Sequence, residues 1–355
     1  MASSAEQFAS SFNFGALSKA ADLKKRIWFT LAALVVYRLG TYIPIPGIDP
    51  AVLKEIFDQN AGGILGMFDM FAGGALGRMT IFALNIMPYI SAAIIMQLMT
   101  AVSPNLDTLK KEGEAGRKKI NQYTRYLTVL LAAVQAYGIS VGLENMASGG
   151  GAAVVNPGLF FRATTVITLV GGTVFLMWLG EQITARGIGN GISLIIFAGI
   201  VANLPQALAG TLELGRTGAL SAAFIVLLLL MAIAVIAFIV FIERSQRKIT
   251  VQYPKRQMGN KMTGGESSHL PLKLNVSGVI PPIFASSILL MPVTFAQFSA
   301  SGGGPEWLTT INALLGRGQP LYLAVYIGLI VFFAFFYTAI VFNPVETADN
   351  LKKYG

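Results

Sequence analysis

The sequence predicts an all-α protein that crosses a membrane several times as a helix bundle. Of its 355 residues, 54% are hydrophobic and only 12% are charged, which is too much apolar surface to bury inside soluble domains of ordinary size. The apolar residues are grouped into segments of about 20 residues, the length that an α-helix needs to cross a bilayer. Lys and Arg are distributed unevenly between the connections, which is typical of a polytopic membrane protein.

Eight segments are long and apolar enough to span a membrane. They are residues 27–43, 79–102, 127–143, 160–179, 192–208, 219–242, 276–295 and 321–342. Twenty of the 26 Lys and Arg residues lie in connections on one side and five on the other, with Arg38 inside the first segment. By the positive-inside rule, the N-terminus is expected in the cytosol, and an even number of spans returns the chain there at Gly355.

The residue types favour no catalytic, redox or metal chemistry. The sequence has no cysteine and one histidine, His269, so it offers neither a disulfide framework nor clustered zinc ligands. It contains no metalloprotease, hydrolase or P-loop motif. Three alternating glycines in "EQITARGIGNGIS" (181–193) lack a preceding strand, so we interpret the segment as a tight cytosolic turn. We therefore expect no catalytic residue, no cofactor and no enzymatic activity.

The stretch "GILGMFDMFAGGAL" (63–76) is apolar but only about half as long as a span. Glycines within and directly beside this stretch give two pairs with the small-xxx-small spacing of close helix packing, Gly62 with Gly66 and Gly73 with Gly77. A half-helix at membrane depth must be surrounded by protein or line a water-filled cavity. Asp69 is either an ion site or a solvated residue of a vestibule, and the absence of another ionisable residue before Arg78 favours the vestibule.

Prolines lie inside the second and the seventh predicted spans. Pro88 lies in the second, and Pro281 and Pro282 lie in the seventh. Each proline removes a backbone donor and loosens a helix. The sequence leaves open whether these are simple kinks or two weakened helices that form a moving seam.

Two connections hold most of the basic charge on the cytosolic side. They are "KKEGEAGRKKINQYTR" (110–125) and a loop of about thirty residues (243–273). Topology and contact with anionic lipid explain such charge. The second loop is longer than a connection between two helices requires. The hypothesis that it docks an acidic or RNA-bearing cytosolic partner therefore remains open.

Several motifs resemble one known family. They are "IPIPGID", "MFDMFAGGAL", "IFALNIMPYISAAIIMQL", "KKEGEAGRKKINQYTRY", "MWLGEQITARGIGNGISLIIFAGI", "HLPLKLNVSGVIPPIFASS" and "FFYTAIVFNPVETADNLKK". Together, in this order and almost from end to end, they are similar to the SecY family, the channel subunits of the bacterial Sec protein translocase.

The resemblance implies a clam-shell of two inverted halves, with five spans each, around an hourglass pore that a plug helix closes from outside. Residues 1–26 would be a cytosolic N-terminal segment. Residues 27–210 would be the first half, with spans 1–5 and the plug at 64–78. Residues 211–355 would be an incomplete second half, with spans 6–8 and the basic loop 243–273. We expect the ninth and tenth spans and the last cytosolic loop to be absent from this chain.

The resemblance also implies four groups of functional residues. The plug would comprise Ile64, Leu65, Met67, Phe68, Asp69, Met70, Phe71, Gly73 and Gly74. The constricting pore ring would include Ile86, Ile90, Ile192, Ile196 and Ile283. The lateral gate would involve Thr80, Ser91, Gln135, Asn275 and Met291. Partner docking would use Arg244, Arg247, Lys248, Lys255, Arg256 and Lys261.

The function implied is passage of unfolded secretory proteins across the bacterial inner membrane, with lateral release of signal and membrane segments into the lipid. The implied partners are SecE, SecG, the SecA motor ATPase, the ribosome, signal sequences, nascent polypeptides and membrane lipids. No direct DNA binding is expected, and ribosomal RNA contact through the basic loops stays open. The alternatives are a broken-helix secondary transporter, which usually needs a midplane carboxylate or paired charges, and an intramembrane enzyme.

Overall fold

The computed structural model describes residues 21–53, 69, 72–145, 147–148, 151–252, 256–258, 261–263, 267–282, 284–286, 288–289, 320–342 and 344–354. Among these residues, five helices are long and apolar enough to cross a membrane, and a bent helix pair makes a sixth if it counts as one span. The chain divides into two compact units. The first is Met1–Pro205 with Leu290–Gln319, and the second is Gln206–Leu289 with Pro320–Gly355.

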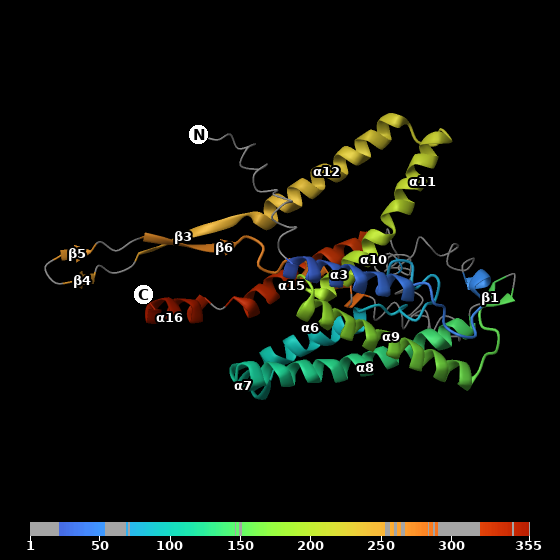
Figure 1. Cartoon of the computed structure of the whole chain (residues 1–355), viewed down its shortest axis with the longest axis horizontal. Coiled ribbons are helices and arrows are strands. Elements are labelled where there is room, and N and C mark those ends of the chain that lie inside the picture. Colours follow the sequence, from blue (N-terminus) through green and yellow to red (C-terminus); the bar gives the residue numbers. More distant parts are fainter. Residues whose placement is uncertain are drawn as a thin grey trace. The chain divides into compact units, whose positions relative to one another are not determined.

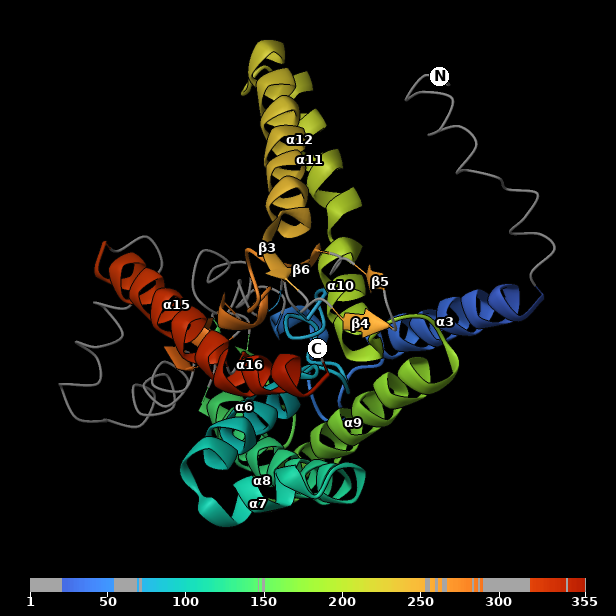
Figure 2. The same ribbon diagram turned by 90° about the vertical axis from the view of Figure 1, so that its left-hand side faces the viewer.

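In the first unit, α8 (Glu114–Asn145) and α9 (Leu159–Arg186) are long helices that pack against each other. The N-terminal α3 (Ala21–Gly40) and α10 (Gly191–Ala202) both contact α9. The short α6 (Met87–Val102) lies against α8 and continues through a sharp bend into α7 (Pro104–Lys111). Figures 1 and 2 both show α6, α8 and α9 side by side.

An ion pair joins the end of α8 to the start of α9 beside a small hairpin of β1 (Ala147–Ser148) and β2 (Gly151–Ala152). Arg162 donates to Glu144 Oε2 through Nε at 2.8 Å and Nη2 at 2.6 Å. The backbone N–H of Gly158 donates to Glu144 Oε1 at 2.9 Å. The Glu144 side chain is only 8% exposed. One carboxylate therefore fixes the α8–α9 connection and the start of α9.

The second predicted span begins later than the sequence predicts. Its helix, α6, starts at Met87 rather than at Met79, and Pro88 lies in the first helical turn. A proline is tolerated there because the first N–H groups of a helix have no intrahelical partner. Of the two possibilities that the sequence left open, a kink at Pro88 does not occur, because α6 begins only one residue before this proline. Residues 79 and 81–86 form turns, with left-handed backbone at Met79 (φ 44°) and Asn85 (φ 52°), and Thr80 forms an isolated β-bridge with Pro44.

The predicted half-helix is also not continuous. Residues 72–79 form successive turns instead of an α-helix. Gly73 (φ 67°) and Gly74 (φ 82°) have left-handed backbone, which ends a right-handed helix. Residues 63–68 and 70–71 lie outside the described residues. These turns are not a surface loop, because Ala72, Ala75, Leu76 and Met79 belong to a buried apolar cluster of the first unit.

The other predicted spans overlap described helices, but their ends differ: residues 27–43 overlap α3, residues 127–143 lie within α8, and residues 160–179 lie within α9. Residues 192–208 fall on α10 and α11 (Leu204–Arg216), which together are long enough to span. The predicted tight turn joins α9 to α10, with Gly189 at φ 73°. Of the seventh predicted span, residues 276–282, 284–286 and 288–289 are described. Residues 276–279 form bends and turns, so the helix begins at residue 280 rather than at 276, and the other described residues are helical.

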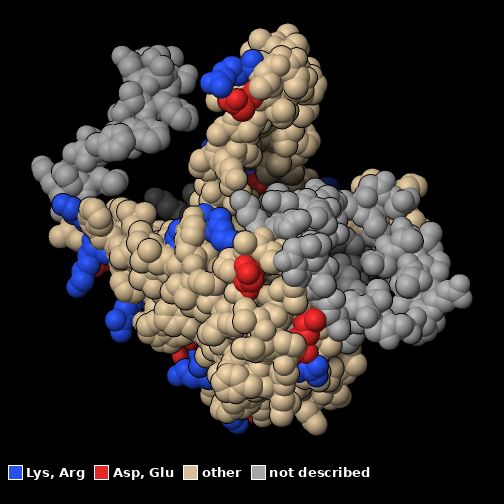
Figure 3. Space-filling view, turned by 90° about the vertical axis from the view of Figure 1, so that its right-hand side faces the viewer, with Lys and Arg blue, Asp and Glu red and all other residues tan. Residues whose placement is uncertain are grey.

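The second unit contains most of α11, then α12 (Ala222–Arg244), α15 (Pro320–Val341) and α16 (Pro344–Tyr354). Helix α12 buries none of its side chains within the structure, as expected for a helix whose apolar surface faces lipid or a partner. Phe284 packs edge-to-face on Phe333 and Tyr337 of α15. On the face drawn in Figure 3, uncharged side chains cover most of the described surface.

The basic loop is a β-hairpin rather than an irregular connection. Strand β3 (Gln246–Gln252) pairs antiparallel with β6 (Ser267–Lys273), and β4 (Arg256–Met258) pairs antiparallel with β5 (Lys261–Thr263). Figure 1 shows the longer pair following α12. The helical fold therefore also contains three two-stranded sheets among its described residues.

Candidate functional site

Four of the five predicted ring residues lie in one apolar cluster. Ile86 is fully buried in it, and Ile90, Ile192 and Ile196 pack against it half-buried. Within each helix the two isoleucines are four residues apart and share a face. The fifth predicted residue, Ile283, lies outside the described residues.

These isoleucines come from the N-terminal ends of two helices. Ile86 is the N-cap residue of α6, and Ile90 follows in its first turn. Ile192 and Ile196 occupy the first two turns of α10. The structure thus brings together side chains that are about 100 residues apart in the sequence.

The corner between α9 and α10 is held by close backbone packing and capping. The side chain of Asn190 accepts the N–H groups of Ile192 at 3.0 Å and Ser193 at 3.3 Å. The hydroxyl of Thr184 accepts the N–H of Gly191 at 2.9 Å. A Cβ at Gly191 would collide with the carbonyl oxygen of Gly180. Glycine at 191 therefore lets α10 begin directly against α9, which sets the position of Ile192.

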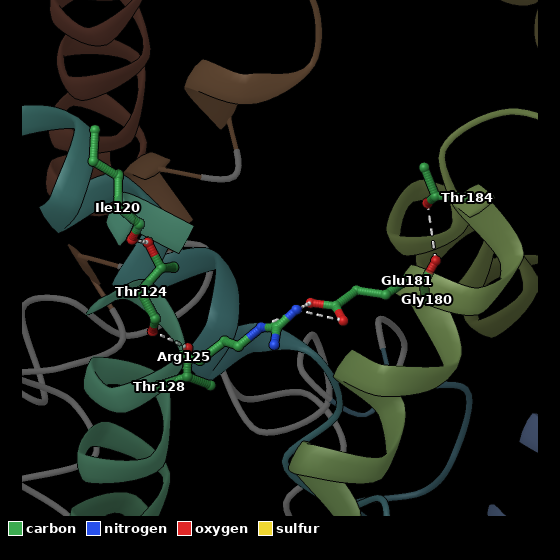
Figure 4. Close-up of polar contacts among 7 residues, drawn as sticks. All are labelled: Ile120, Thr124, Arg125, Thr128, Gly180, Glu181 and Thr184. Carbon is green, nitrogen blue, oxygen red and sulfur yellow. Dashed lines mark hydrogen bonds and ion pairs between the residues drawn. The ribbon is translucent and has the colours of Figure 1, made fainter. Parts of the chain in front are cut away.

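An ion pair ties the same end of α9 to α8, as Figure 4 shows. Arg125 donates to Glu181 through Nε at 3.1 Å and through Nη2 at 2.8 Å. Both side chains remain partly exposed, at 50% for Arg125 and 36% for Glu181. Glu181 follows Gly180, so this pair and the glycine contact act on one turn of α9. Neither residue was a predicted site residue, because the partner of Arg125 is 56 residues away.

Three of the predicted plug residues, Asp69, Gly73 and Gly74, are described. Asp69 stabilises the turns locally, since its carboxylate accepts the N–H of Gly77 at 2.6 Å and its carbonyl accepts that of Gly74 at 2.8 Å. Gly73 lies against Gly199 of α10. The remaining predicted plug residues, Ile64, Leu65, Met67, Phe68, Met70 and Phe71, lie outside the described residues.

Three of the predicted gate residues, Thr80, Ser91 and Gln135, are described in the first unit. Thr80 is fully buried, and its hydroxyl donates to the carbonyl of Ala75 at 3.3 Å. Ser91 on α6 and Gln135 on α8 are half-buried. Met291 lies outside the described residues.

Asn275 belongs to the second unit and is engaged there. Its side-chain amide donates to Glu243 Oε1 at 2.8 Å. Its side-chain oxygen, Oδ1, accepts hydrogen bonds from the hydroxyl of Ser277 at 3.0 Å and from the N–H of Gly278 at 3.1 Å. Asn275 therefore links the end of α12 to the segment that follows β6.

The predicted docking residues follow the hairpin along its length. Arg244 ends α12, and Arg247 and Lys248 lie on β3. Arg256 and Lys261 lie on β4 and β5, where they pair with Thr263 and Met258. Lys255 lies outside the described residues. Five of the six predicted residues are thus on α12 or on the strands that follow it.

The chain matches known proteins over most of its length. The family model that matches residues 80–355 is SecY. The protein translocase subunit SecY of Rickettsia conorii is 58% identical over 334 residues, which are 94% of this chain and 77% of that protein.

Two solved channels have a similar fold. One, described as a protein conducting channel, aligns with a TM-score of 0.57 at 20% identity. The other, Sec61 in the canine ribosome-channel complex from the endoplasmic reticulum, aligns with a TM-score of 0.56 at 19% identity. Each alignment covers 81% of this chain and 61% of the solved chain. The family model and the 58% identical relative together establish that this chain is a multi-pass membrane protein of the SecY family.

Proposed function

We propose that this chain forms the pore of a Sec-type translocon in a bacterial inner membrane. It passes unfolded secretory proteins across the membrane and releases hydrophobic segments sideways into the lipid. The identity of 58% with a bacterial protein translocase subunit supports this function. The fold shared with a protein conducting channel supports it as well.

The observation that carries the proposal is the convergence of Ile86, Ile90, Ile192 and Ile196 in one apolar cluster. A narrow neck lined by bulky aliphatic side chains excludes water and gives an ion no fixed polar partner. Such side chains also yield to a passing polypeptide of any sequence. A ring of this kind is closed to ions at rest and open to an extended chain.

The plug and the lateral gate complete the proposed channel. Residues 64–78 close the outer funnel, and the gate opens between spans 2 and 3 on one side and spans 7 and 8 on the other. Polar contacts in a membrane protein contribute only about 1 kcal/mol each. A hydrophobic signal segment can therefore displace those made by gate residues such as Thr80 and Gln135.

The chain itself supplies no chemical energy in this proposal and is not an enzyme. A cytosolic SecA ATPase or a translating ribosome drives transport after docking on the basic hairpin, and SecE and SecG are the membrane partners. The comparison with Sec61, which was solved in a ribosome-channel complex, supports the ribosome as a partner. The excess of Lys and Arg in one set of connections supports a cytosolic N-terminus.

The alternative of an ion-coupled secondary transporter has less support. Such a transporter usually needs a carboxylate or a charge pair inside its spans. Asp69 is the candidate carboxylate, but it accepts the backbone N–H of Gly77 and thereby caps a turn. Its hydrogen bond thus favours a structural role.

The proposed function can be tested in vesicles that contain this chain with SecE and SecG. With SecA and ATP, a preprotein should enter the lumen and become protected from added protease. The same preprotein without its signal segment, and vesicles without this chain, should give no protection. Equal protection with and without this chain would refute the proposed function.

A further inference from the structure

Arg38 is a charged residue inside the first apolar segment that the proposed channel function leaves unassigned. It lies two residues before the end of α3 and is half-buried. Its Nη1 donates to the backbone carbonyl of Gly73 at 2.9 Å, across 35 residues of sequence. Its Nη2 donates to the hydroxyl of Tyr42 at 3.0 Å. The guanidinium thus connects α3 directly to the turns of the proposed plug.

Tyr42 and Arg78 fix the environment of this guanidinium. The guanidinium carbon of Arg38 lies 5.0 Å from the centroid of the Tyr42 ring, and that of Arg78 lies 4.5 Å from it. Both cations are attracted to the ring, but they repel each other. Within the described part of the chain, neither arginine forms a salt bridge. The carbonyl of Gly73 is therefore an important source of negative partial charge for Arg38.

Gly73 fits between two helices because it has no side chain. A Cβ built there would lie 2.9 Å from the carbonyl oxygen of Gly199 on α10 and 3.3 Å from Nη1 of Arg38. The left-handed backbone at Gly73 independently disfavours other residues. Gly73 is thus held between α3 on one side and α10, which carries Ile192 and Ile196, on the other.

We propose that Arg38 is a positioning residue that holds the turns of residues 72–78 against α10 while the channel is closed. This inference rests on the proposed function, because it requires residues 64–78 to act as the plug. When a polypeptide displaces the plug, the bond between Arg38 and Gly73 breaks. Arg38 keeps its hydrogen bond to Tyr42, which lies only four residues further along the chain. It therefore stays in place to re-form the bond when the channel empties.

The resting ion conductance of the channel in a planar bilayer tests this role. Loss of a hydrogen bond to a charged group shifts a two-state equilibrium by about tenfold, so Arg38→Gln should raise the resting conductance by about tenfold. Arg38→Lys should give an intermediate conductance, because an ammonium keeps the charge but not the planar fork. Gly73→Ala should also leak, by moving the same turn without changing any charge. The control is Arg216→Gln, since Arg216 is 82% exposed and pairs only with nearby Glu213 among the ion pairs described.

A deletion of residues 64–74 separates this role from a general folding defect. The deletion variant should have a raised resting ion conductance. Adding Arg38→Gln to the deletion variant should raise this conductance no further, because both changes act on the same closed state. If Arg38→Gln raises the conductance equally with and without the plug, the positioning role is wrong. If the deletion leaks while Arg38→Gln remains tight, this inference fails but the plug stands. If the deletion itself remains tight, the plug assignment fails, and the role of Arg38 fails with it.

Discussion

Arg125 on α8 bonds both carboxylate oxygens of Glu181 on α9, next to the glycine against which α10 begins (Figure 4). This pair lies outside the apolar cluster, yet it is connected through one turn of α9 to the corner that carries Ile192. Its geometry is that of a two-pronged arginine–carboxylate pair, which fixes orientation as well as distance.

We expect the ion pair of Arg125 and Glu181 to contribute little to the free energy of unfolding. Because both side chains are partly exposed, Arg125→Gln should lower the free energy of unfolding by only about 0.5–1 kcal/mol. The double variant with Glu181→Gln should cost little more than either single variant. Thermal unfolding in detergent measures all three. Lys111 and Asp107 form an exposed pair within α7, so Lys111→Gln is the matched control and should have less effect. Additive costs of the two single changes would show that Arg125 and Glu181 act independently.

The pair of Glu144 and Arg162, whose carboxylate is only 8% exposed, should contribute more. Glu144→Gln removes the charge that both nitrogens of Arg162 contact, while a carbonyl remains to accept the N–H of Gly158. We expect a loss of about 2 kcal/mol in the free energy of unfolding, the range of hydrogen bonds to charged groups. Thermal unfolding in detergent again measures it, with Glu213→Gln on the exposed pair of α11 as the control. Equal losses for the two variants would contradict the importance of burial at Glu144.

The sequence predicts the long helices well because their signal is local. Residues 127–143 and 160–179 are apolar over a full bilayer length, and α8 and α9 contain both segments. The same criterion failed at residues 79–86, which are apolar and buried but form turns. Hydrophobicity reports burial there, whereas the backbone path follows from left-handed Asn85 and from Pro88 at the start of α6. Burial and helix formation are separate properties, and the sequence of residues 79–86 predicts only that they are buried.

The basic loop contains a residue pattern that is typical of a strand, although its charge was the feature from which its role was predicted. Residues 248–252 alternate polar and apolar side chains, with the β-branched Ile249 and Val251 as the apolar ones, which is the pattern of a strand. That pattern agrees with β3. The contacts of Arg38 with Gly73 and of Arg125 with Glu181 had no comparable signal. They join residues 35 and 56 positions apart, and such pairs follow from packing rather than from local periodicity.

Polar substitutions in the proposed ring should make the channel leak. Replacing Ile86 and Ile196 with Asn adds amide groups that hold water in an apolar neck. We expect a higher resting conductance and export of preproteins whose signal segments are defective. The volume-conserving changes Ile86→Leu and Ile196→Leu keep the neck apolar and serve as controls. Asn variants that remain tight to ions and selective for signal segments would remove these residues from the ring.

Charge reversal on the basic hairpin tests partner docking. Arg256 and Lys261 lie on the two paired strands β4 and β5, so changing both to Glu alters the charge of one small sheet. If this sheet docks a ribosome or SecA, we expect binding to weaken by about tenfold at low salt. The difference between parent and variant should shrink as salt is added, because charges on a protein surface act over about one Debye length. The exchange of Arg256→Lys with Lys261→Arg keeps the charge and is the matched control.

Membrane topology should survive this reversal, so a loss of binding would not reflect misinsertion. Five positive charges would remain in residues 243–273 to keep the hairpin in the cytosol. They are Arg244, Arg247, Lys248, Lys255 and Lys273. If the basic charge serves only topology and lipid contact, the reversed variant should bind ribosomes and SecA as the parent does, while its insertion or its binding to anionic vesicles changes. Co-sedimentation with purified ribosomes or SecA across a salt series distinguishes the two cases. Parent-like binding at low salt would show that Arg256 and Lys261 do not dock either partner.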